Sequence, residues 1–201
     1  MELALRVTGL VLIAAGLRWP MPPAVRWPTP RIAIALVGTA LAIVSFALMG
    51  HTSVTPHRLA AAALLVLHLL VVAFWIGALW PLYRVTRDAS PPVAGRLIDA
   101  FSQVAAWVVP VILIAGVGLA ALLVPSLTTF QQPYGQLLLA KVVGFAILMG
   151  LATLNKWKYG PACATGETHA FRKAVLVEYL LICLVLAVTA TMTTFYSPEV
   201  P

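Results

Sequence analysis

Apolar residues fill this chain in six long runs, and short stretches between them hold most of the charged residues and prolines. Each run is close to the ~20 residues that an α-helix needs to cross a bilayer. The apolar residues are continuous rather than alternating, which is not the pattern of a transmembrane β-barrel. The pattern therefore predicts six membrane-spanning helices, at about residues 3–19, 31–50, 58–83, 97–124, 135–156 and 172–196.

Proline marks the links between these predicted helices. The first link is proline-rich over residues 19–30, so no helix is expected to continue through it. Residues 88–92 and 159–161 are expected to break the chain in the same way. Pro110 lies within the fourth run, where it should kink the helix rather than end it.

Composition excludes several classes of protein. Hydrophobic residues make up 62% of the chain and charged residues 9%, against about 45–50% and about 25% in soluble proteins. Such a chain is neither a soluble enzyme nor a disordered protein. We therefore expect an all-α polytopic bundle of about six helices, forming a single integral-membrane domain over residues 1–201.

The basic residues predict an orientation in the bilayer. The net charge of +7 does not indicate nucleic-acid binding, because ten of the thirteen Lys and Arg residues cluster in the first, third and fifth links. The positive-inside rule places these links in the cytoplasm and both termini in the periplasm. Cleavage of residues 1–19 as a signal peptide would invert the remaining links, so this run is expected to be a span.

Three ionisable residues are predicted to lie at one depth in the outer half of the membrane. Counting ~1.5 Å per residue from the basic anchors puts His51 at the outer boundary, with His68 and Lys141 about four to five residues below it. Met49 and Met192 fall near the same level. Ionisable residues inside a bilayer are costly and indicate function, so this layer is the main candidate site.

The side chains of this layer suit copper. Imidazole binds copper, and a thioether favours Cu⁺, without any need for a thiolate. His51 and Met49 could together offer both donors at one helix end. His57 lies on the same helical face as His68 but about 16 Å away, so we expect it to be an entry residue. Lys141 is expected to pair with an anion, relay a proton or exclude stray cations.

The inner half of the predicted bundle has polar residues of its own, namely Asp99, Gln103, Asn155 and Glu178. Two interpretations of Glu178 stay open. It either forms a hydrogen bond within the bundle or ends a path that begins at His68.

Several short motifs resemble the CopD family of copper-resistance membrane proteins. The stretch from His68 to Trp75 and Gly77 is similar to the family's His-to-Trp-x-Gly helix. Residues 134–141, Tyr-Gly-Gln-Leu-Leu-Leu-Ala-Lys, resemble its Tyr-Gly-x-x-Leu-x-x-Lys element, which adds Tyr134 and Trp75 to the candidate residues. The resemblance covers roughly residues 45–195. The chain departs from larger members in having about six spans rather than eight, and no Met-rich loop.

The resemblance implies copper uptake or tolerance at the bacterial inner membrane, beside a periplasmic copper-binding partner. The leading hypothesis is a protein that binds or passes copper from the periplasmic side, with His51, His57 and Met49 receiving it and His68 holding or passing it. One alternative is a b-type haem protein with His51 and His68 as axial ligands. Another is a non-transporting assembly subunit. No catalytic motif is recognisable, so an enzyme is not expected.

Overall fold

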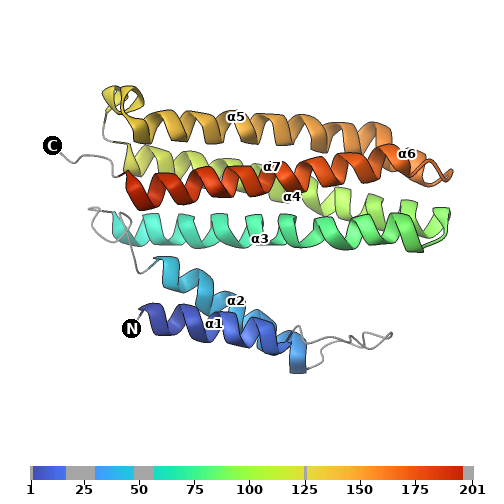
Figure 1. Ribbon diagram of the computed structural model, residues 1–201, viewed down its shortest axis with the longest axis horizontal. Helices are drawn as coiled ribbons and strands as arrows, with labels where there is room; N and C mark the ends of the chain where they lie inside the picture. The colour runs from blue at the N-terminus through green and yellow to red at the C-terminus, as the bar shows by residue number, and fades with distance from the viewer. Residues whose placement is uncertain (1, 17–29, 48–56, 125, 197–201) are drawn as a thin grey trace. The chain divides into compact units, whose positions relative to one another are not determined.

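The computed structural model describes residues 2–16, 30–47, 57–124 and 126–196, and the elements in these ranges are helices (Figure 1). The chain divides into two compact units, residues 1–70 and 71–201. The elements in chain order are α1 (Glu2–Gly16), α2 (Pro30–Ala47), α3 (Arg58–Asp88), α4 (Pro91–Leu123), the 3₁₀-helix η2 (Leu127–Gln131), α5 (Pro133–Leu154), the π-helix η3 (Asn155–Tyr159), α6 (Gly160–Cys163) and α7 (His169–Phe195).

Each of the six apolar runs is helical where it is described, which confirms the all-α fold class. Four helices are long and apolar enough to cross a membrane, namely α3, α4, the α5–α6 helix and α7. The apolar segments of α1 and α2, Leu3–Gly16 and Pro30–Phe46, are shorter. The predicted ends of the first two spans, at residues 17–19 and 48–50, lie outside the described residues. The prediction of a single membrane domain stays a prediction.

In the first unit, α1 and α2 approach each other closely at two glycines. A Cβ atom on Gly9 would lie 2.7 Å from the carbonyl oxygen of Gly38, and a Cβ atom on Gly38 would lie 2.6 Å from that of Gly9. Both are closer than real Cβ atoms come, so any larger residue would push the helices apart. This is the small-residue packing that lets membrane helices touch along their backbones.

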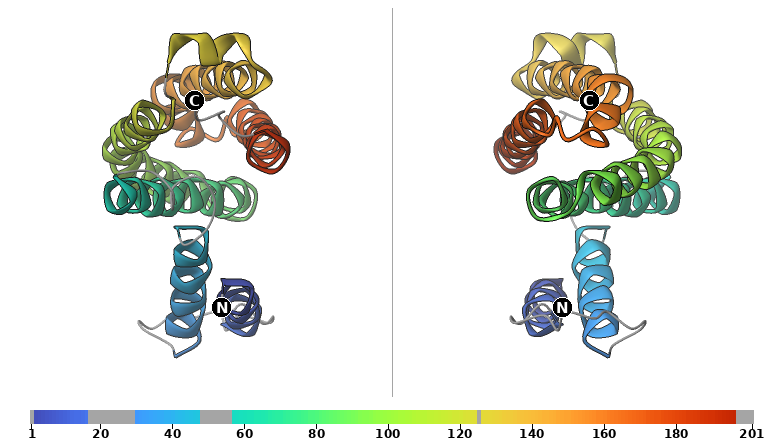
Figure 2. Two further views of the ribbon diagram at one scale, coloured as in Figure 1. Left: turned by 90° about the vertical axis from the view of Figure 1, so that its left-hand side faces the viewer. Right: turned by 90° about the vertical axis from the view of Figure 1, so that its right-hand side faces the viewer.

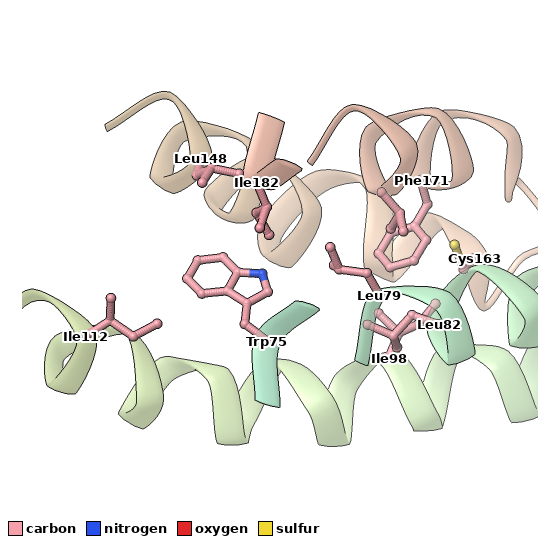
Figure 3. Close-up of a cluster of buried hydrophobic side chains, with 10 residues drawn as sticks. Trp75, Leu79, Leu82, Ile98, Ile112, Leu148, Cys163, Phe171 and Ile182 are labelled. Atoms are coloured by element: carbon pink, nitrogen blue, oxygen red, sulfur yellow. The ribbon is translucent and has the colours of Figure 1, made fainter. Parts of the chain in front are cut away.

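In the second unit, residues 71–88 of α3 pack with α4, α5 and α7 around a common apolar core. The views along the helices in Figure 2 show α4, α5 and α7 arranged around this centre. Figure 3 shows the core side chains, with Trp75 and Leu79 from α3 facing Leu148 from α5 and Ile182 from α7. Burial of these side chains between four helices positions the polar cluster described below.

Proline affects the helices differently at the three sites compared next. The predicted break at 88–92 is confirmed, since α3 ends at Asp88 and α4 begins at Pro91, where a missing N–H is harmless. Helix α4 continues through Pro110, as expected. The predicted break at 159–161 is wrong, because a single helix continues from Pro133 to Cys163.

Candidate functional site

A π-helical turn explains how the fifth long helix passes Pro161. The N–H of Gly160 donates to the carbonyl oxygen of Asn155, five residues earlier, instead of four. This wider turn lets α6 begin with Pro161 in its first turn, where no N–H is needed. A Cβ atom on Gly160 would lie 2.7 Å from the same Asn155 oxygen, so the turn requires glycine. Such π-turns inside α-helices are frequent at functional sites.

The first residue of this turn joins a buried polar cluster. Nδ2 of Asn155 donates a hydrogen bond of 2.8 Å to Oε1 of Glu178 on α7. The side chain of Trp75 on α3 donates a second hydrogen bond to the same carboxyl group. Glu178 is 3% exposed and Asn155 is 8% exposed. Three helical segments thus place one carboxyl group and its two donors in the interior of the bundle.

A cavity of about 220 Å³ lies beside this cluster. Trp75, Asn155 and Glu178 form its polar wall, while the other walls are mainly apolar side chains from α3, α4, α5 and α7. Lys156 is the one other charged residue in the lining. The space is large enough for several water molecules, and the carboxyl group makes it suitable for a proton or a small cation.

Glu178 forms a hydrogen bond within the bundle, which was one of its two interpretations. Its hydrogen bond to Asn155 is the intrabundle bond that the first interpretation predicts. The sequence marks both residues as polar positions in the predicted inner half but does not pair them. The signal was present, because both interrupt apolar runs on the same predicted side of the membrane.

The predicted outer layer is only partly described. His51 and Met49 lie outside the described residues. His68 is half-buried on α3 within the first unit, whereas Lys141 is half-buried on α5 within the second. Met192, near the end of α7, is buried. The common depth of these residues therefore stays a prediction.

The remaining candidates have simple surroundings. His57 is exposed, and its carbonyl oxygen accepts the N–H of Ala61 at the start of α3. Lys141 forms no ion pair with any described acid, since both ion pairs in the described ranges use Asp88. No three His, Cys, Asp or Glu side chains in those ranges come together as metal ligands.

The Tyr-Gly pair at the start of α5 forms a tight structural joint. Tyr134 is buried, and Gly135 packs directly against the backbone of Thr129 and Phe130, leaving no space for a Cβ atom. The glycine therefore lets the 3₁₀-helix η2 fold back onto α5. Close packing explains this part of the motif without any direct role in binding.

Comparison with known proteins gives a consistent result. A family model described as CopD, copper resistance protein D, matches residues 95–192. The chain is also 28% identical over 216 aligned residues to the copper resistance protein D of Pseudomonas syringae pv. tomato, which covers 98% of this chain and 67% of the relative. The chain is therefore similar to the CopD family over about half of its length, and to one copper resistance protein D over nearly all of it. These matches and the four long apolar helices support a membrane protein related to copper resistance, as its motifs predicted.

The match of the CopD model has a clear boundary within the structure. It takes in α4 from residue 95, η2, α5, η3, α6 and nearly all of α7, and therefore includes Lys141, Asn155 and Glu178. His51, His68 and Trp75 lie before it and are covered by the alignment to the Pseudomonas protein, which extends over nearly the whole chain. No solved structure matches this chain.

Proposed function

We propose that this protein, which resembles the CopD family, binds copper at the periplasmic face of the bacterial inner membrane and passes it into the helical bundle. The position of His68 is the observation that supports the proposal most directly. It is a half-buried imidazole within a helix long and apolar enough to cross a membrane. An ionisable residue in that position is costly and points to function, and imidazole is a common copper ligand.

The proposed path begins outside the membrane. His51, Met49 and the exposed His57 would receive copper, and His68 would hold it or pass it on. Lys141, Met192, Trp75 and Tyr134 would shape the path without ligating the metal. The role is binding and transfer, with no chemical reaction at the protein.

Orientation and partner are part of the same proposal. The basic residues Lys156, Lys158, Arg172 and Lys173 flank the α6–α7 link, so the positive-inside rule supports a cytoplasmic location for that end. The histidines of residues 51–57 would then face the periplasm. The donor in this proposal is a periplasmic copper-binding protein, as the resemblance to the CopD family implies.

Copper binding by the purified full chain tests this proposal. His51→Ala and His68→Ala should each lower copper stoichiometry or weaken affinity by about tenfold or more. His169→Ala is the matched control, because His169 is exposed at the start of α7 and should leave binding unchanged.

Unchanged stoichiometry and affinity in both variants would overturn the proposal. An optical spectrum of the same sample separates the haem alternative. A Soret band that disappears in His68→Ala would assign that histidine to haem and remove it from a copper path.

A further inference from the structure

The polar cluster in the second unit contains a hydrogen-bond acceptor without a donor. Asn155 donates through Nδ2 to Glu178, but no described group donates to its buried Oδ1 atom. A buried carbonyl oxygen without a donor is unfavourable and rare in folded proteins. If Glu178 is ionised, the cluster therefore leaves the Oδ1 atom of Asn155 without a donor.

Glu178, which already accepts a hydrogen bond from the same amide, is the group in the cluster that can gain the missing donor. An ionised carboxylate only accepts hydrogen bonds, whereas a protonated carboxyl group also has an O–H donor. A carboxylic acid and an amide pair through two bonds, from the amide N–H to one acid oxygen and from the acid O–H to the amide oxygen. The first bond is present at 2.8 Å, and the second requires a proton on Glu178.

The second donor to this carboxyl group is compatible with either protonation state. The side chain of Trp75 donates to Glu178, and the carbonyl oxygen of a neutral acid has two lone pairs that can accept both donors. Among these three side chains, only a protonated Glu178 has a donor left for Oδ1 of Asn155, so this atom distinguishes the two states.

The charges around Glu178 also favour a protonated carboxyl group. In the cavity lining, α3 contributes Trp75 and no titratable group, and α4 and α5 contribute none either. Lys156 of η3 is the one basic residue there, and it forms no ion pair with Glu178. A carboxylate buried without a counter-charge is strongly disfavoured, and a proton removes that charge.

We propose that Glu178 and Asn155 form a proton-binding site within the membrane-spanning bundle, whose occupied state is the doubly hydrogen-bonded acid–amide pair. Binding forms one O–H bond on Glu178 and one hydrogen bond to Oδ1 of Asn155. On release the proton passes to water in the adjoining cavity, and the carboxylate keeps its bonds to Asn155 and Trp75. The site does not depend on copper.

Infrared spectroscopy of the full chain in detergent, without copper, tests the proposal. The wild-type protein should show a protonated-carboxyl C=O band that shifts in D₂O and fades as pH rises. Glu178→Gln should remove this band while keeping the shape of the side chain. Asp99→Asn is the matched control, since Asp99 is an exposed carboxylate bonded to Gln103 at 2.9 Å.

A second variant tests the pairing itself. Asn155→Leu should move the band to higher frequency, because the acid C=O loses its N–H donor. A band that Glu178→Gln removes supports the site even if Asn155→Leu does not fold. A wild-type spectrum without this band at any pH at which the protein stays folded, or a band that Glu178→Gln leaves in place, would overturn the proposal. Because no copper is present, either result is independent of the copper-binding experiment.

Discussion

Each of the two compact units places an ionisable side chain among apolar helices, but the surroundings differ. In the first unit, Nε of Arg6 lies 3.3 Å from Oγ of Ser45, and its guanidinium lies 4.1 Å from the centre of the Phe46 ring. Both partners come from α2, so Arg6 joins the helix pair. In the second unit, Glu178 adjoins a cavity and an amide oxygen that lacks a donor.

The difference shows which ionisable side chain among apolar helices indicates chemistry. Arg6 has a hydrogen bond and a cation–π contact to a neighbouring helix, and a role in packing accounts for them. The Glu178 cluster has space beside it and an acceptor that no described group satisfies. An ionisable side chain among apolar helices by itself indicates only an energetic cost. One that lies beside an unsatisfied hydrogen-bond acceptor and a cavity indicates a site.

The largest expected loss of unfolding free energy comes from a substitution that disrupts the packing of the first unit. Gly38→Val places a Cβ atom against the backbone of Gly9, which cannot move without separating α1 from α2. We expect a loss of about 3 kcal/mol in unfolding free energy in mixed micelles. Gly77→Val is the control, because nothing lies within 4 Å of a Cβ atom at Gly77. Equal effects of the two substitutions would contradict the close packing of α1 and α2.

A smaller effect is expected in the polar cluster of the second unit. Asn155→Leu leaves the buried Glu178 carboxyl without one of its donors, at a cost of about 2 kcal/mol in unfolding free energy. Gln103→Leu removes the same kind of amide–carboxylate bond from the exposed Asp99, and we expect a change below about 0.5 kcal/mol. If Gln103→Leu lowers the unfolding free energy as much as Asn155→Leu does, burial between helices does not explain the stabilising effect of the Glu178–Asn155 hydrogen bond.

The smallest expected loss of unfolding free energy comes from a substitution of Arg6, which tests the contrast between Arg6 and Glu178. Arg6→Met keeps much of the length of the side chain but loses the hydrogen bond to Ser45 and the contact with Phe46. We expect a loss of about 1 kcal/mol in unfolding free energy, measured in the same micelles. We also expect copper binding and the infrared band of Glu178 to stay as in the wild type. A change in either property would give Arg6 a role beyond packing.

The sequence by itself determined where the helices lie and what kind of protein they form. Hydropathy and charge are properties of neighbouring residues, so the apolar runs, the proline break before Pro91 and the CopD motifs could be recognised without a structure. The continuation of the helix past Pro161 could not, because it depends on a π-helical bond from Gly160 to Asn155.

Only the tertiary structure decided which polar residues meet. Asn155 and Glu178 are 23 positions apart on different helices, and their contact depends on how each helix is rotated in the bundle. That rotation follows from packing around Trp75, Leu148 and Ile182 and from the π-turn that begins at Asn155. Counting residues along one helix gives depth in the membrane, but helix rotation is set by the side chains of its neighbours.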